Sequence, residues 1–144
     1  MTAILPGLEL VGVSHTFGNK TVIRGLDLVV PGGSLTCLLG PSGCGKTTVL
    51  RLAAGLETLQ AGQIKINDVC VADVNNTIPP ETRNVGLMFQ DYALFPHLTV
   101  LRNVSFGLNS LPTDSRDVMA KEALARVGML DAAGFYPHML SGGE

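Results

Sequence analysis

The segment that constrains this chain most is the glycine-rich run at residues 40–47, with the sequence GPSGCGKT. It fits the pattern GxxxxGK[ST], and every fixed position is filled, by Gly40, Gly45, Lys46 and Thr47. An apolar run precedes this segment at residues 34–39, and apolar residues at helical spacing follow it up to Gly55. The pattern therefore predicts a buried strand, a tight loop and a helix that begins near Thr47.

A loop of this kind can surround a triphosphate, because little side-chain bulk lets successive backbone N–H groups turn inward. The start of the following helix adds unpaired N–H groups and the positive end of its dipole. We expect Lys46 to reach the β and γ phosphates, the Thr47 hydroxyl to coordinate Mg²⁺, and Thr48 to add a phosphate contact. The residues expected to hold the nucleotide here are Gly40, Pro41, Ser42, Gly43, Cys44, Gly45, Lys46, Thr47 and Thr48.

The rest of the chain shows strands first and helices later. Alternating apolar residues predict a hairpin of two strands at residues 8–17 and 22–30, with its turn at residues 18–20. Apolar runs at residues 34–39 and 85–89 are typical of strands buried on both faces of a parallel sheet. Short strands are expected around Ile64 and at residues 69–74, and helices at residues 100–108, after Thr99, and 116–127. For the last helix we expect a cap at Asp114 or Ser115, and an end at Gly128. This order predicts an α/β core with a helical insertion.

Charge and cysteine content exclude several classes of protein. Ten basic and twelve acidic residues give a net charge of −2, and there is no basic tract to attract nucleic acid. We therefore expect no nucleic-acid partner. No apolar stretch reaches the roughly 18 residues that would span a bilayer. The three cysteines, an odd number without CxxC spacing, indicate neither a disulfide framework nor a zinc site.

Two further segments follow the loop in order. Gln90 follows the second buried run, and the sequence LSGGE occupies residues 140–144. With these segments, residues 8–144 resemble the ATP-binding subunit of an ATP-binding cassette (ABC) transporter. The stretch at residues 84–100, NVGLMFQDYALFPHLTV, looks like that of importer subunits for iron(III), polyamines, sulfate, sugars or phosphonates. A phosphate loop alone would leave kinases, GTPases and motor ATPases open. A small-molecule kinase would need an arginine-bearing lid and an acceptor pocket in place of these two segments.

The resemblance implies a P-loop NTPase fold of the ABC ATPase type, with an N-terminal antiparallel β hairpin, a partial parallel core sheet and a helical subdomain. Residues 1–144 are then a single, incomplete ATP-binding domain. Its nucleotide-binding core is expected at about residues 1–90. The helical subdomain is expected at about residues 91–144, where it ends in the family's signature motif.

The resemblance also implies roles for residues outside the loop. Phe17 matches the aromatic residue that stacks on adenine, which its flat face can do. Gln90 matches the glutamine that touches Mg²⁺ and the attacking water and connects the site to the membrane subunits. Signature residues Ser141, Gly142 and Gly143 would bind ATP held by the opposite subunit. Glu144 stands where the family usually has glutamine, and a carboxylate accepts hydrogen bonds but cannot donate one as an amide does.

The partners implied by the resemblance are those of an importer ATPase. ATP and Mg²⁺ would be its ligands. A second ATP-binding subunit would complete a head-to-tail homodimer, and transmembrane permease subunits and a solute-binding protein would complete the transporter. The subunit would lie on the cytoplasmic face of the cell membrane, attached through the permease. It would couple ATP binding and hydrolysis to solute uptake.

The sequence ends where the family's strand with a metal-coordinating Asp, a catalytic Glu and a switch His would follow. The chain is therefore expected to be truncated after the signature, and the alternative function is a nucleotide-binding fragment without turnover. General-base catalysis contributes about 10²- to 10⁴-fold to rate. We predict that the 144-residue chain retains ATP on a filter but releases phosphate at close to the background rate. Phosphate release abolished by Lys46→Ala would contradict this.

Overall fold

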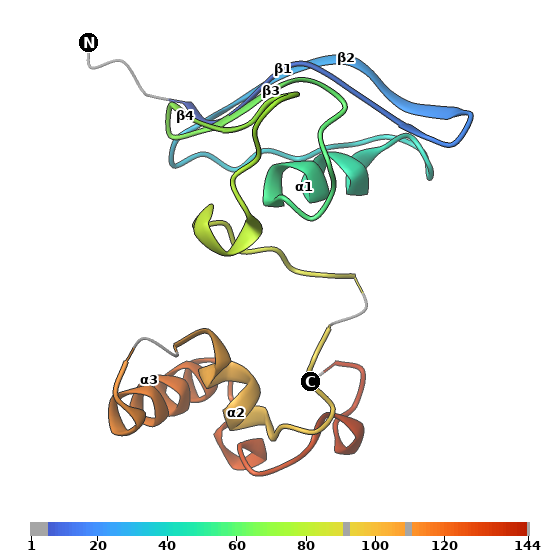
Figure 1. Ribbon diagram of the computed structural model, residues 1–144. Coiled ribbons are helices and arrows are strands. Elements are labelled where there is room, and N and C mark those ends of the chain that lie inside the picture. The colour runs from blue at the N-terminus through green and yellow to red at the C-terminus, as the bar shows by residue number, and fades with distance from the viewer. Residues whose placement is uncertain (1–5, 91–92, 109–110, 144) are drawn as a thin grey trace. The chain divides into compact units, whose positions relative to one another are not determined.

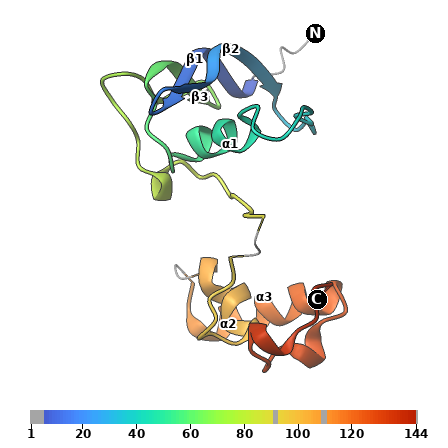
Figure 2. The same cartoon turned by 90° about the vertical axis from the view of Figure 1, so that its right-hand side faces the viewer.

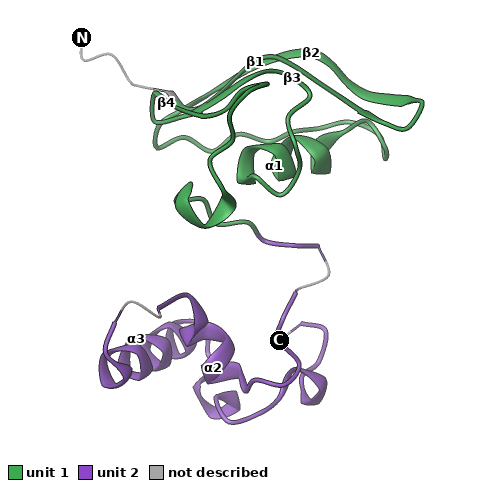
Figure 3. Cartoon of the chain, viewed as in Figure 1, with its two compact units in different colours: residues 1–87 green, residues 88–144 purple. Residues whose placement is uncertain are grey.

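The chain forms two compact units, residues 1–87 and residues 88–144 (Figure 3). The computed structural model describes residues 6–90, 93–108 and 111–143. The first unit contains a sheet with the helix α1 against one of its faces, and the second contains helices α2 and α3 (Figures 1 and 2). This arrangement confirms the expected α/β fold class. The functional assignment of residues 1–90 and 91–144 as core and helical subdomain stays a prediction.

The sheet has four antiparallel strands in the order β2-β1-β3-β4. Their bounds are Pro6–Phe17 for β1, Lys20–Pro31 for β2, Ala61–Ile66 for β3 and Val69–Ala72 for β4. The expected hairpin is confirmed as the pair β1–β2. Asn67 and Asp68 connect β3 to β4 with φ angles of 48° and 64°, which suits the tight turns of two-residue hairpins.

Bulges interrupt the alternation of β1 and β2. Leu10 pairs with Leu28 and Val13 with Leu26, so β1 carries an extra residue beside Gly12, whose φ is +60°. Leu10 and Val13 are consequently both buried although they are three residues apart. The bulged backbone is not left unpaired, because the Gly12 N–H donates to Asp27 Oδ1 at 2.7 Å. On β2, Gly25 has the same role and donates to Ser14 Oγ at 2.8 Å.

The helix α1, Lys46–Ala54, packs against the sheet and closes the core of the first unit. Its buried residues are Val49, Leu52, Ala53 and Ala54. The core also contains residues from β1 to β4 and from the α1–β3 connection, namely Leu10, Val13, Ile23, Leu59, Ile64, Val71 and Ala72. Gly55 ends the helix as expected, with φ of 81° and its N–H bonded to the Leu52 carbonyl at 3.1 Å.

The prediction of two further strands is wrong. Residues 34–39 and 85–89 have irregular backbone and no ladder partner among the residues that the structure describes. Leu35 and Leu39 are 93% and 92% exposed, and Met88 is 92% exposed. An apolar run predicts that a segment prefers burial, but a parallel strand exists only where neighbouring strands supply its hydrogen bonds. The antiparallel part of the expected sheet is therefore present, and its parallel part is not found in the described ranges.

The second unit is built from helices and short 3₁₀ turns. Helix α2 covers Val100–Ser105 and continues as the 3₁₀ turn Phe106–Leu108, and α3 covers Thr113–Arg126. Two further 3₁₀ turns follow at Leu130–Ala132 and Pro137–Met139. Thr99 caps α2, since its side chain accepts from the Arg102 N–H at 3.3 Å. No helix in the described part of the chain combines the length and hydrophobicity that crossing a membrane requires.

The start of α3 differs from the expectation. The helix begins at Thr113, ahead of Asp114 and Ser115, and no side chain caps it. Pro112 stands directly before it, where the missing proline N–H removes no helical hydrogen bond. The expected end is confirmed, because Gly128 has φ of 73° and its N–H bonds to the Ala125 carbonyl at 3.1 Å.

Arg83 lies near the C-terminal end of the first unit, and its side chain forms hydrogen bonds with the last turn of α1. It follows the 3₁₀ turn Pro80–Thr82, and only 4% of it is exposed. Its Nη1 donates to the Leu52 and Ala53 carbonyl oxygens at 2.8 and 3.0 Å, and its Nε to the Ile78 carbonyl at 2.7 Å. Burial lowers the pKa of the guanidinium, which nevertheless stays charged. The side chain thus places a cation at the negative end of the α1 dipole.

Arg83→Met should lower the free energy of unfolding by about 3 kcal/mol, because hydrogen bonds to charged groups contribute about 1.5–3 kcal/mol and their carbonyl partners would be left unpaired. Urea denaturation followed by circular dichroism measures the change. Arg51→Met, at an exposed residue of the same helix, is the matched control and should change stability by less than about 0.5 kcal/mol. Equal losses in both variants would contradict the capping role.

Candidate nucleotide site

The glycine-rich loop needs glycine for two different reasons. Gly43 and Gly45 have φ of 80° and 99°, in the left-handed region that other residues rarely adopt. At Gly45 space is also limiting, since a Cβ there would lie 2.8 Å from the Val22 carbonyl oxygen and 3.1 Å from Ile23 Cγ1. The loop therefore packs directly on the start of β2, the end of the hairpin where Phe17 pairs with Lys20.

Lys46 is the first residue of α1 and reaches back across the loop. Its Nζ donates to the Gly40 and Pro41 carbonyl oxygens at 2.7 and 2.8 Å, and contacts Cys44 Sγ at 3.6 Å. Among the described residues, no carboxylate forms an ion pair with this ammonium group. The loop therefore holds a positive charge that is balanced only by dipoles, and such a charge attracts an anion.

The start of α1 presents donors to the same region. Gly45 occupies the N-cap position, no side chain caps the helix, and its first turn has no acidic residue. The first N–H groups of the nine-residue helix therefore lack a side-chain acceptor and carry the positive end of the dipole. Thr47 is exposed here and Thr48 is half-buried. Backbone donors, one ammonium group and a hydroxyl fit a polyphosphate with a bound Mg²⁺, which prefers oxygen ligands and keeps several from water or phosphate.

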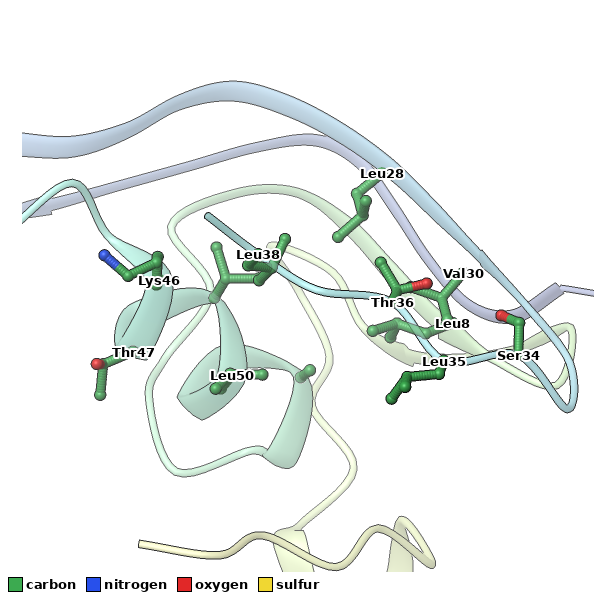
Figure 4. A pocket seen from close by; sticks show the side chains of 12 residues that line it. Leu8, Leu28, Val30, Ser34, Leu35, Thr36, Leu38, Lys46, Thr47 and Leu50 are labelled. Carbon is green, nitrogen blue, oxygen red and sulfur yellow. The ribbon is translucent and has the colours of Figure 1, made fainter. Parts of the chain in front are cut away.

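A pocket of about 570 Å³ lies beside this loop, between β1, β2, residues 34–38 and α1. Figure 4 shows Lys46 and Thr47 on one side of it and Leu8 and Leu35 on the other. Most of its lining side chains are apolar, so the pocket is an unfilled part of the core and not a phosphate site. Its polar lining residues are Lys46 and Thr47 on the side of the loop and Ser34 and Thr36 on the opposite side.

Phe17 ends β1 directly before the turn at Gly18 and Asn19, and 47% of it is exposed. Its ring packs on His15, with ring centroids 4.5 Å apart and planes inclined by 68°. Gln60 fixes the peptide between these two residues, since its Oε1 accepts from the Thr16 N–H at 2.8 Å and its Nε2 donates to the Thr16 carbonyl at 2.9 Å. The backbone before Phe17 is thus held in place, and about half of the residue remains exposed.

The remaining predicted site residues belong to the second unit. Gln90 is exposed, and so are Ser141, Gly142 and Gly143. Lys46, Thr47 and Phe17 belong to the first unit, in which the loop packs on β2 of the hairpin, whereas Gln90 and the signature segment belong to the second unit. Glu144 lies outside the described residues. In the described ranges, no three His, Cys, Asp or Glu side chains gather where they could hold a metal ion.

Sequence reasoning missed His15 and Gln60. The spacing of two positions in an alternating strand places His15 and Phe17 on the same face, but a single histidine gives no sign of a role at the site. Gln60 is 44 residues away from the peptide that it clamps. No local pattern could have indicated this contact, which depends on how the α1–β3 connection returns to the sheet.

Comparison with known proteins agrees with this geometry. The family model described as "ABC transporter" matches residues 23–144. The spermidine/putrescine import ATP-binding protein PotA of Salmonella typhimurium is 46% identical over 144 residues, and that of Escherichia coli K12 is 45% identical over 145 residues. Each match covers 99% of this chain and 37% of the relative, so the chain spans about 37% of the length of these relatives.

A solved structure supports the same conclusion. The ATP-binding cassette MJ0796, in a dimeric post-hydrolysis state bound to ADP and Pi, superposes with a TM-score of 0.82 at 26% identity. The match covers 94% of this chain and 64% of that one. The family match includes the glycine-rich loop at the start of α1, and the PotA matches cover 99% of the chain. This chain belongs to the ABC transporter family.

Proposed function

We propose that the chain is the ATP-binding part of an ABC importer subunit that couples ATP binding and hydrolysis to solute uptake. The observation that carries this proposal is the loop itself: glycines in left-handed conformation, an uncapped helix start and a cation without a carboxylate partner among the described residues. The names of the PotA relatives, import ATP-binding proteins, support import as the process.

Within the first unit, each residue has a distinct role in this proposal. Backbone N–H groups of residues 42–48 bind phosphate oxygens, and Lys46 exchanges its contacts with the Gly40 and Pro41 carbonyls for the β and γ phosphates. The Thr47 hydroxyl is a ligand of Mg²⁺, which when bound neutralises charge on these phosphates. Phe17 offers the open face on which adenine stacks.

In this proposal, residues of the second unit interact with the permease and with a second ATP-binding subunit. Gln90 contacts Mg²⁺ and the attacking water, and responds to the permease. The Ser141 hydroxyl and the N–H groups of Gly142 and Gly143 bind ATP held by a second subunit in a head-to-tail homodimer. The dimeric state of the MJ0796 cassette supports this arrangement. Permease subunits hold the dimer at the cytoplasmic face of the membrane, and a solute-binding protein delivers the solute.

Lys46→Ala should weaken ATP binding at least about 10-fold, because charge-assisted hydrogen bonds contribute about 1.5–3 kcal/mol. Titration calorimetry of the 144-residue chain with Mg²⁺ and ATP measures the affinity. The matched control is Lys121→Ala, which removes an exposed lysine of α3 and should leave the affinity unchanged. Absence of ATP binding by the folded wild-type chain would refute the proposed function.

Phe17→Ala should separate binding of the base from binding of the phosphates. Stacking on an aromatic side chain contributes about 1–3 kcal/mol per base, so the affinity for ATP should fall about 10-fold. The affinity for inorganic tripolyphosphate, which has no base, should not change. Phe135→Ala is the control, since Phe135 is 45% exposed against 47% for Phe17 but lies in the second unit. Equal losses for both ligands would contradict base stacking.

A further inference from the structure

His15 is a buried polar residue at a position where an apolar side chain could fill the same space. Only 2% of it is exposed, and neither Nδ1 nor Nε2 has a hydrogen-bond partner among the described residues. The nearest carboxylate oxygen is Glu57 Oε1, 3.8 Å from Nε2 and beyond hydrogen-bond distance. A buried polar group without a partner destabilises the fold, and an aliphatic side chain at this position would avoid that loss.

The contact that His15 does make is with Phe17. Residues two apart on a strand point to the same side, and the two rings meet at 4.5 Å with planes inclined by 68°. This is the edge-to-face arrangement that aromatic rings prefer, because the positive edge of one faces the negative face of the other. An aliphatic side chain could fill the same space but could not form this pair.

Phe17 needs such a support because little else restrains it. It is the last residue of β1 and is nearly half exposed, so without a packing partner its ring would sample several rotamers. Gln60 restrains the backbone before it through Thr16, but a backbone restraint does not set the orientation of the ring. His15 is the side chain that contacts the Phe17 ring in an aromatic pair.

We propose that His15 is a positioning residue for nucleotide binding, which holds the Phe17 ring in the orientation that accepts the base. The inference rests on the proposed stacking of adenine on Phe17. His15 itself does not touch the nucleotide. A ring that is already ordered loses less rotamer freedom when the base arrives, so the base binds more tightly.

The test compares ATP with inorganic tripolyphosphate in calorimetric titrations of the 144-residue chain. His15→Ala should weaken ATP binding by about 2- to 10-fold, the value of an aromatic pair, and leave tripolyphosphate binding unchanged. His15→Phe keeps a planar ring at the position and should restore most of the preference for ATP. Val13→Ala shortens another fully buried side chain of β1 and serves as the control for lost stability, with the preference for ATP retained.

The outcomes distinguish this inference from the proposed function. If wild type prefers ATP and His15→Ala retains that preference, the inference is wrong and base stacking stands. If His15→Ala weakens both ligands equally, His15 is only a structural residue and the inference is wrong. If wild type binds ATP no better than tripolyphosphate, Phe17 does not stack on the base and the inference fails with the stacking role, whereas the function proposed from the loop fails only if ATP does not bind at all.

Discussion

The packing of α1 against the sheet is the interaction on which the rest of the first unit depends. A nine-residue helix is too short to be stable alone in water, so tertiary contacts must hold it. Leu52 and Val49 supply them, and full burial of such side chains contributes about 1.5–3 kcal/mol each. Arg83 restrains the other end of the helix through the Leu52 and Ala53 carbonyls. The position of Lys46 and of the loop before it follows from this packing.

The glycine-rich loop packs closely on the backbone of the hairpin. Gly45 lies so near the Val22 carbonyl that no side chain fits between them. The bulges at Gly12 and Gly25 let two long strands keep their apolar side chains on the core side while the ladder shifts register. The hairpin therefore supplies the backbone at Val22 on which the loop packs, and also the Phe17 ring beside the hairpin turn. The phosphates and the base of a nucleotide would thus be held by neighbouring parts of a single unit.

Local patterns predicted the elements whose determinants are local. The hairpin, α1 with its end at Gly55, and the start of α2 after Thr99 were predicted because alternation, helical spacing and capping residues act over a few positions. The runs at residues 34–39 and 85–89 were predicted as strands and are not. Their apolar composition is real, but strand formation depends on hydrogen-bond partners elsewhere in a chain, which composition does not report. The start of α3 was misplaced because a proline began the helix without a capping side chain.

For the site, residue types and their spacing were enough to predict the chemistry of the loop. The pattern from Gly40 to Thr47 specifies which backbone positions can be left-handed and where the ammonium and hydroxyl groups stand, since these depend on residue type and spacing alone. The long-range part of what surrounds Phe17 depends on the folded chain. The His15 ring lies beside it because the two residues are two apart on β1, whereas the Gln60 clamp on Thr16 forms where a connection 44 residues further along meets the strand. Contacts across such a separation depend on the folded path of the chain, and no spacing rule in the sequence encodes that path.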